Sequence, residues 1–244
     1  MSTKLSIVLV HGAWADASCW RHNIPKLLDE GYDVSAPQLP ESSVADDVKK
    51  VQTMLDSKKG PTVVVGHSYG GMVITEAAAN RNNVKALVYI SAFALDAGET
   101  LNKILKGYPP TPVLSAIAPD SAGYFYINKE KFREVFAQDV DEEEARVMAV
   151  TQKPLAGATL DQTINAAAWK NIPSWFLVTT EDRVVHPDLQ RFVAKRMNAN
   201  VTEIRSSHAS FIAKPDITTN LILDVAKMVS EGKSGPKAME APAI

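Results

Sequence analysis

Short apolar runs alternate with helical patterns along almost the whole chain, and this alternation restricts the possible folds more than any other feature. The runs with the length and apolar content of buried strands are residues 5–10, 32–37, 61–66, 84–90, 175–180 and 201–206. The stretches in which apolar residues recur at helical spacing are about 16–30, 43–57, 70–80, 187–198 and 216–231. Strands that alternate with helices are typical of an α/β fold whose parallel sheet is buried on both faces. The sequence therefore predicts one mainly parallel sheet of about six strands with helices on both faces.

The alternation is interrupted once, between residues 94 and 170. Two charged helical patterns, 129–139 and 141–152, lie in this region among stretches that contain proline and glycine. Connections in compact domains usually take about two to six residues, so we expect this region to be an inserted cap. It should cover the carboxyl edge of the sheet, where α/β folds bind their ligands. The predicted divisions are a first part of the core at 1–93, the cap at 94–170, a second part of the core at 171–232 and a disordered tail at 233–244.

Composition and charge exclude several classes of protein. The chain has 244 residues with 26 basic and 28 acidic side chains, a balance that lacks the positive surface needed to bind nucleic acid. The single cysteine, Cys19, excludes an intramolecular disulfide and a cysteine-based zinc site. No stretch approaches the about 20 apolar residues of a membrane span. We expect a cytoplasmic protein that acts on a small molecule without a metal or a cofactor, as a monomer or a homodimer.

One predicted strand ends in a serine that lies between two glycines. Residues 66–70 read Gly-His-Ser-Tyr-Gly and match the pattern G-x-S-x-G, in which the serine occupies a sharp turn between a strand and a helix. The apolar run 61–66 precedes the turn and the helical pattern 70–80 follows it, as the motif requires. Such a turn exposes the hydroxyl group at the top of the sheet. Ser68 is therefore the predicted nucleophile.

A serine hydroxyl needs a general base, and histidine is the side chain whose pKa suits that function near neutral pH. The histidines of the chain are His11, His22, His67, His186 and His208. In a fold with this turn, the acid and then the base follow the serine along the chain. His208 lies in a short loop between the last predicted strand and the final helix, and is the predicted base. His67 adjoins Ser68, but the turn directs its side chain away from the hydroxyl, so we expect a structural role.

The acid that orients this histidine should follow the preceding strand. The loop after residues 175–180 offers Glu181 and Asp182, of which Asp182 ends the turn and is preferred. Asp96, after the strand at 84–90, is the alternative, because some enzymes of this architecture carry the acid at that place. Position along the chain is the basis of both assignments.

A tetrahedral oxyanion needs two backbone N–H groups that are aimed at it in advance. Tyr69 directly follows the nucleophile and is the first predicted donor. The second donor should lie in the loop after the first strand, where Gly12 lets the chain turn back toward the serine. This placement assigns Ala13 as the second donor.

These segments together resemble the plant methylesterase and hydroxynitrile lyase group of α/β-hydrolases and its bacterial esterase-like relatives. The resemblance lies in VLVHGAWADASCW (8–20), VVVGHSYGGMVITEAA (63–78), ALVYISAFALDAGE (86–99) and TTEDRVV (179–185), followed by the loop of His208. It spans about residues 5–230 and implies the α/β-hydrolase fold, a serine hydrolase without a cofactor, and a cap over an apolar pocket. It also implies Ser68, His208 and Asp182 as the triad, with Ala13 and Tyr69 as oxyanion donors.

Three positions depart from members of that group. The lyases carry a lysine after the histidine and a threonine in the first loop, whereas this chain has Ala209 and Gly12 at those places. These two residues disfavour lyase activity. Plant methylesterases usually have leucine after the nucleophile, where this chain has Tyr69, so their substrates do not transfer directly.

The sequence predicts a serine carboxylesterase that cleaves small to medium, apolar or aromatic esters through an acyl-enzyme on Ser68. Two alternatives stay open, namely a perhydrolase or lyase on the same scaffold and a receptor-like protein whose triad turns over slowly or not at all. The aromatic residues predicted to line the substrate pocket are Trp14, Tyr69, Phe93, Tyr124, Phe125 and Trp169.

Overall fold

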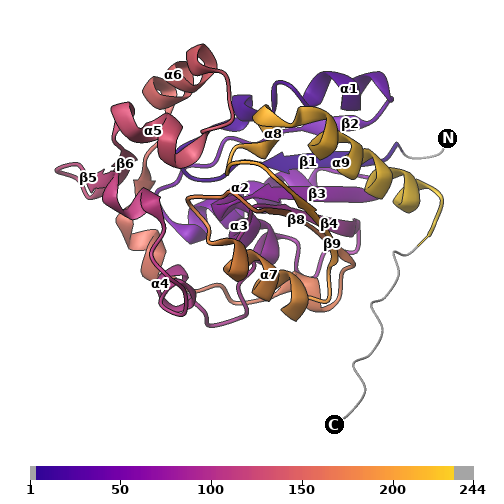
Figure 1. The fold of residues 1–244 in the computed structure, drawn as a ribbon. Helices are drawn as coiled ribbons and strands as arrows, with labels where there is room; N and C mark the ends of the chain where they lie inside the picture. The colour runs from indigo at the N-terminus through magenta and orange to yellow at the C-terminus, as the bar shows by residue number, and fades with distance from the viewer. Residues whose placement is uncertain (1–3, 234–244) are drawn as a thin grey trace, which may run out of the picture.

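The computed structural model of the protein describes residues 4–233 and contains the predicted sheet (Figure 1). The strands of this six-stranded sheet lie in the order β2-β1-β3-β4-β8-β9, and every neighbouring pair runs parallel. Their bounds are β1 (Ser6–Val10), β2 (Asp33–Ser35), β3 (Thr62–His67), β4 (Val84–Ile90), β8 (Ser174–Thr179) and β9 (Asn200–Ile204). Each strand overlaps one predicted run. The prediction of an α/β fold with a six-stranded parallel sheet is confirmed.

Burial of the strands follows their position in the sheet. Every residue of β1, β3 and β8 is buried, whereas the edge strand β9 is half-buried or exposed along its length. Strands that are covered on both faces need continuous apolar runs, such as the three valines at 63–65. Because parallel strands end at the same edge of a sheet, the loops that follow β1, β3, β8 and β9 meet there.

Helices cover both faces of the sheet (Figure 1). One face carries α1 (Ile24–Asp29), α8 (Ser210–Ala213) and α9 (Pro215–Ser230), and the other carries α2 (Val44–Asp56), α3 (Tyr69–Ala77) and α7 (Pro187–Arg196). The prediction of one helix at about 16–30 was wrong, because a 3-10 helix at Ala17–Trp20 is separated from α1. Pro25 at the start of α1 lacks an N–H, and in a continuous helix its ring would clash with the carbonyl one turn earlier. No helix within residues 4–233 combines the length and the apolar character that crossing a bilayer requires.

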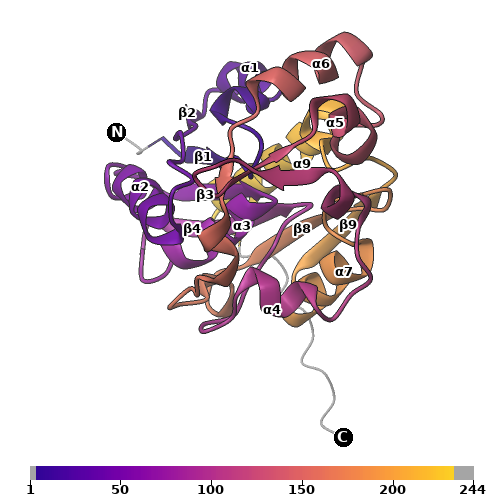
Figure 2. The ribbon, with the colours of Figure 1, turned by 90° about the vertical axis from the view of Figure 1, so that its left-hand side faces the viewer.

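Residues 94–170, the predicted cap, form helices and a small sheet at one end of the core (Figure 1), the end that faces the viewer in Figure 2. The helices are α4 (Leu101–Leu105), α5 (Lys129–Phe136) and α6 (Glu142–Thr151), with 3-10 helices at Pro112–Ser115, Gly157–Asp161 and Ala168–Lys170. The antiparallel strands are β5 (Ile117–Pro119), β6 (Tyr124–Ile127) and β7 (Leu155–Ala156). The two charged helical patterns of the sequence form α5 and α6. Residues 234–244, almost all of the predicted disordered tail, lie outside the described residues.

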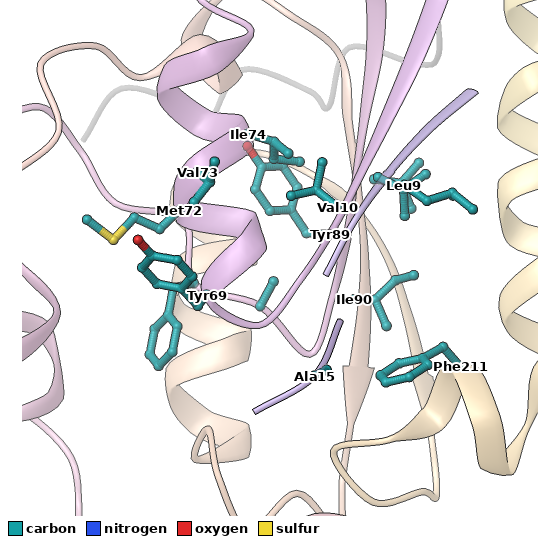
Figure 3. Packing of buried hydrophobic residues seen from close by; sticks show 14 of the residues in the cluster. Leu9, Val10, Ala15, Tyr69, Met72, Val73, Ile74, Tyr89, Ile90 and Phe211 are labelled. Carbon is teal, nitrogen blue, oxygen red and sulfur yellow. The ribbon is translucent and has the colours of Figure 1, made fainter. Parts of the chain in front are cut away.

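The core next to the strand ends is packed from strands and helices together (Figure 3). Val10 of β1, Ile74 of α3 and Tyr89 of β4 are fully buried. Tyr89 forms a hydrogen bond to Thr75 Oγ1 at 2.9 Å, and its ring stacks on Phe176 of β8 at 5.9 Å. Full burial of a large apolar side chain contributes about 1.5 to 3 kcal/mol. The loops at the carboxyl edge therefore extend from a rigid base.

Candidate active site

The turn between β3 and α3 holds Ser68 in a strained backbone conformation. Its φ of 51° and ψ of −123° lie in a region that residues with a side chain rarely adopt. The Ser68 N–H donates to Ile90 O at 3.1 Å, and the Ser68 carbonyl accepts a hydrogen bond from Phe93 N at 3.1 Å. The end of β4 and the residues after it therefore hold the turn in place. Strain that the surroundings maintain in this way is typical of functional sites.

Glycines surround Ser68 because the backbone there packs too closely for side chains. A Cβ atom at Gly66 would lie 2.8 Å from Gly70 O, and one at Gly70 would collide with His11 O. A Cβ atom at Gly12, in the loop after β1, would lie 2.7 Å from Ser68 Cβ. The serine turn and the loop after β1 are therefore in direct contact, as one shared site requires.

The structure brings the predicted base and the preferred acid together. His208 Nδ1 is 2.8 Å from Asp182 Oδ2, and both side chains are fully buried. An ionised carboxylate can only accept hydrogen bonds, so this contact places the imidazole proton on Nδ1. The alternative acid, Asp96, lies elsewhere, and its Oδ1 is 2.6 Å from Lys170 Nζ. The geometry supports Asp182 as the partner of His208.

The opposite ring nitrogen of His208 is available as a base. Nε2 has no hydrogen-bond partner within residues 4–233. With the proton on Nδ1, Nε2 carries the lone pair that can accept a proton. His67 Nε2 donates to the His208 carbonyl at 2.9 Å, which ties the histidine loop to the residue before Ser68. Burial lowers the pKa of His67 well below its usual value, and a neutral His67 in this position fits the predicted structural role.

The Asp182 carboxylate is held by further donors besides His208. Its Oδ1 accepts hydrogen bonds from Val184 N at 2.8 Å and Val185 N at 2.9 Å. Its Oδ2 accepts from Thr179 Oγ1 at 3.0 Å and Gln190 Nε2 at 2.8 Å. The carboxylate is therefore fixed in one orientation. Sequence reasoning missed the last two donors. The available signal for one of them is that Gln190 shares the apolar face of α7 with Leu189 and Val193.

The two predicted oxyanion donors are the backbone N–H groups of Ala13 and Tyr69. Among the described residues, neither the Ala13 amide nor the Tyr69 amide donates to a protein acceptor. The Gly12 carbonyl accepts a hydrogen bond from His11 Nδ1 at 3.0 Å, and His11 Nε2 accepts one from Leu39 N at 3.0 Å. Since a carbonyl and the following N–H point to opposite sides of a trans peptide, this contact directs the Ala13 N–H away from His11. Burial lowers the pKa of His11 to about 4, which keeps Nε2 an acceptor.

A network of buried acidic groups lies beside the oxyanion loop. The Tyr69 hydroxyl donates to Asp47 Oδ2 at 2.6 Å, and Glu41 N donates to Asp47 Oδ1 at 2.7 Å. The Glu41 carboxyl is 3.5 Å from His11 Nδ1, and neither of its oxygens forms a hydrogen bond within residues 4–233. Burial raises the pKa of Glu41 to about 10, so this group is neutral near pH 7. Within residues 4–233, no group of three or more His, Cys, Asp or Glu side chains is arranged to hold a metal ion.

A cavity of about 320 Å³ opens on Ser68, and most of its wall is apolar. The predicted pocket residues that line it are Trp14, Tyr69, Phe93 and Phe125. The cavity is also lined by residues that the sequence analysis missed. Among them are Leu101 and Leu105 of α4 and Tyr108, which follows that helix. Its volume is at the lower end of the about 300 to 1,000 Å³ that is usual for small-molecule sites. The cap therefore supplies much of the wall of the cavity.

Two predicted pocket residues lie elsewhere. Tyr124 precedes Phe125 on β6, and because successive side chains of a strand point to opposite faces, Phe125 lines the cavity and Tyr124 does not. Trp169 donates from Nε1 to Leu95 O at 3.0 Å, and the Arg196 guanidinium lies over its ring. Neither Tyr124 nor Trp169 is among the residues that line the cavity beside Ser68, because membership of a cap segment does not determine the direction of a side chain.

Comparison with known protein families identifies this scaffold. The model that describes the alpha/beta hydrolase family matches residues 7–219, which include the serine turn, the acid and the histidine. The chain belongs to the alpha/beta hydrolase family. The fold that the resemblance implied is thereby confirmed.

Several relatives match this alpha/beta hydrolase along nearly its whole length. Pyrethroid hydrolase of Sphingobium wenxiniae is 26% identical, and the match covers 96% of this chain and 94% of that protein. Methylesterase 2 of Arabidopsis thaliana is 24% identical, with coverage of 91% and 96%. The crystal structure of a pyrethroid hydrolase from Sphingobium faniae covers 93% of this chain and 100% of its own, with a TM-score of 0.79 at 23% identity. The predicted resemblance to plant methylesterases and bacterial relatives is confirmed.

Proposed function

We propose that this alpha/beta hydrolase is a serine carboxylesterase that cleaves small to medium, apolar or aromatic esters through an acyl-enzyme on Ser68. The observation that carries the proposal is the hydrogen bond between His208 Nδ1 and Asp182. It leaves His208 Nε2 without a protein partner among the described residues. The His67 side chain ties the histidine loop to the residue before Ser68, and this contact supports a base close to the proposed nucleophile. This combination of a strained serine turn with an oriented histidine supports acyl transfer.

In the first half-reaction, Ser68 Oγ attacks the ester carbonyl while His208 Nε2 takes the hydroxyl proton. The N–H groups of Ala13 and Tyr69 stabilise the oxyanion, and each such donor contributes about 2.7 to 4 kcal/mol. Asp182 holds the ring and stabilises the imidazolium. His208 then gives its proton to the departing alcohol, and the acyl group stays on Ser68. In the second half-reaction, His208 activates a water molecule that releases the acid and restores the serine.

The cavity supports the proposed substrate class. Its wall contains aromatic side chains from the core and the cap, of which Phe93 and Phe125 are two, and much less polar surface. A volume of about 320 Å³ favours esters with a short acyl chain and a small or aromatic alcohol over large lipids. The names of the relatives, pyrethroid hydrolase and methylesterase, support hydrolysis as the reaction class.

Hydrolysis of p-nitrophenyl acetate and butyrate by the wild type and by Ser68→Ala tests this proposal. We expect turnover by the wild type and a loss of kcat of at least about a thousandfold in Ser68→Ala, because the nucleophile has no substitute. A wild type that binds an apolar ester without cleaving it would replace the esterase with a receptor-like role.

A further inference from the structure

The turn that follows α5 in the cap contacts the loop that carries His208. Asp139 Oδ2 accepts a hydrogen bond from Ser206 Oγ at 2.7 Å and another from Ser207 N at 3.1 Å. Both serines are fully buried, and they directly precede His208. One carboxylate of the cap therefore holds both the backbone and a side chain of the histidine loop.

The last residue of α5 contacts the His208 ring. Phe136 is fully buried, and its ring centre lies 4.9 Å from that of the imidazole at an interplanar angle of 81°. Aromatic pairs favour this edge-to-face arrangement. Phe136 therefore limits the tilt of the imidazole ring, while Asp139 limits movement of the backbone that carries it.

Neighbouring residues tie the acid loop to the same cap segment. Gln138 Nε2 donates to Glu181 O at 2.6 Å, and Arg183 Nη1 donates to Glu134 O at 2.9 Å. Glu181 and Arg183 are the two chain neighbours of Asp182. A short piece of the cap thus contacts the loops of both the base and the acid.

We propose that Asp139 is a positioning residue for His208, an inference that rests on the proposed esterase function. Asp139 is not among the residues that line the cavity beside Ser68, so it acts on the histidine loop and not on the substrate. Without its carboxylate, the Ser206 hydroxyl and the Ser207 N–H lose their acceptor in a buried place, and the loop shifts. Misplacement of a catalytic group by about 1 Å can lower the rate about a hundredfold. Loss of Asp139 therefore lowers kcat and leaves KM unchanged.

Matched variants separate this role from a general contribution to stability. Asp139→Ala removes both hydrogen bonds to the histidine loop. Asp139→Asn keeps a carbonyl oxygen in place of Oδ2, and its amide replaces Oδ1, which has no hydrogen-bond partner within residues 4–233. Asp141→Ala is the control, because the Asp141 carboxylate accepts hydrogen bonds from Glu143 N and Glu144 N of α6 and not from the histidine loop.

Steady-state kinetics with a p-nitrophenyl ester give the first readout. We expect Asp139→Ala to lower kcat about tenfold to a hundredfold, with KM within about twofold of the wild type. Asp139→Asn should retain kcat within about threefold. Asp141→Ala should retain kcat but lower the melting temperature, because α6 loses its cap. Ser206→Ala removes the donor of one of the two hydrogen bonds to Asp139 and should give a smaller fall in kcat. This variant keeps the test available if Asp139→Ala does not fold.

The proton NMR signal of His208 Nδ1–H gives a readout that does not depend on turnover. It is identified by its loss in His208→Ala. We expect the signal to broaden in Asp139→Ala and to persist in Asp139→Asn and Asp141→Ala. An unchanged signal with unchanged kcat in Asp139→Ala overturns the inference, and so does a rise in KM without a fall in kcat. A wild type that cleaves no ester removes the proposed function instead, and the NMR comparison still decides the role of Asp139.

Discussion

The His67 side chain donates from Nε2 to the backbone carbonyl of His208 at 2.9 Å, so the residue before the predicted nucleophile holds the loop of the predicted base. The two imidazole rings lie 4.5 Å apart. This contact joins the end of β3 to the loop after β9, although the two residues are 141 positions apart in the chain. The relative position of the serine and the histidine therefore depends on a side chain that takes no part in proton transfer.

Replacement of His67 by alanine should lower esterase activity without removing a catalytic group. The buried His208 carbonyl loses its donor, which costs about 1 to 3 kcal/mol, and the histidine loop becomes free to shift. We expect kcat to fall about tenfold or more. His22→Ala is the control, because His22 lies on the surface beside Glu144. Equal activity of the two variants would show that the contact does not position the base.

The two candidate acids are separable by amide substitution. Asp182→Asn should lower kcat by about ten thousandfold, as loss of the orienting carboxylate does in other triads, because the imidazole no longer keeps its proton on Nδ1. Asp96→Asn should change kcat by less than about twofold, since the Asp96 carboxylate contacts Lys170 and the Ala97 N–H and not His208. Hydrolysis of one p-nitrophenyl ester by both variants measures the difference. The reverse order of effects would assign the acid to Asp96.

Adjacent residues of β6 should differ in their effect on specificity. Phe125 lines the cavity, whereas Tyr124 does not. Phe125→Ala enlarges the pocket, so the preference in kcat/KM should move from p-nitrophenyl acetate toward longer acyl chains by about tenfold, the size expected for a few methylene groups. Tyr124→Ala should leave the preference unchanged. A similar shift in both variants would mean that the cavity beside Ser68 is not the acyl site.

The neutral Glu41 carboxyl should make the stability of the protein fall at alkaline pH. Burial raises its pKa from 4.5 to about 10 in the folded state, so between these values the folded state keeps a proton that the unfolded state has lost. Stability therefore decreases as the pH rises through this window. Glu41→Gln lacks this titration. Relative to the wild type, the free energy of unfolding of this variant should rise by up to about 1.4 kcal/mol per pH unit. Urea unfolding between about pH 5 and pH 9 measures the difference, and a difference that is constant with pH would refute the assignment.

The elements that the sequence predicted well are those whose signal is local. The valines at 63–65 form a strand buried on both faces, and the glycines around Ser68 are required by backbone contacts within a few ångströms. The order of the strands along the chain then places Asp182 and His208 at the same edge as the serine. Fold and site geometry thus follow from short patterns and from the rules of parallel sheets.

The features that the sequence did not predict depend on contacts across long separations. Asp139 lies in a charged stretch that is typical of a surface, and its contact with Ser206 spans 67 positions. The strands β5, β6 and β7 have only two to four residues each, too few for an alternating pattern. Side-chain direction in the cap was equally unpredictable, as Tyr124 and Trp169 show, because no motif orients those segments.

The central claim is that Ser68 is a nucleophile that His208 activates, and covalent labelling tests it most directly. The protein is treated with a fluorophosphonate, digested and analysed by mass spectrometry, with Ser68→Ala and His208→Ala treated in parallel. The account predicts one label on the peptide that contains Ser68, no label in Ser68→Ala and much slower labelling in His208→Ala. An unlabelled wild type, or a label on another residue, would contradict it.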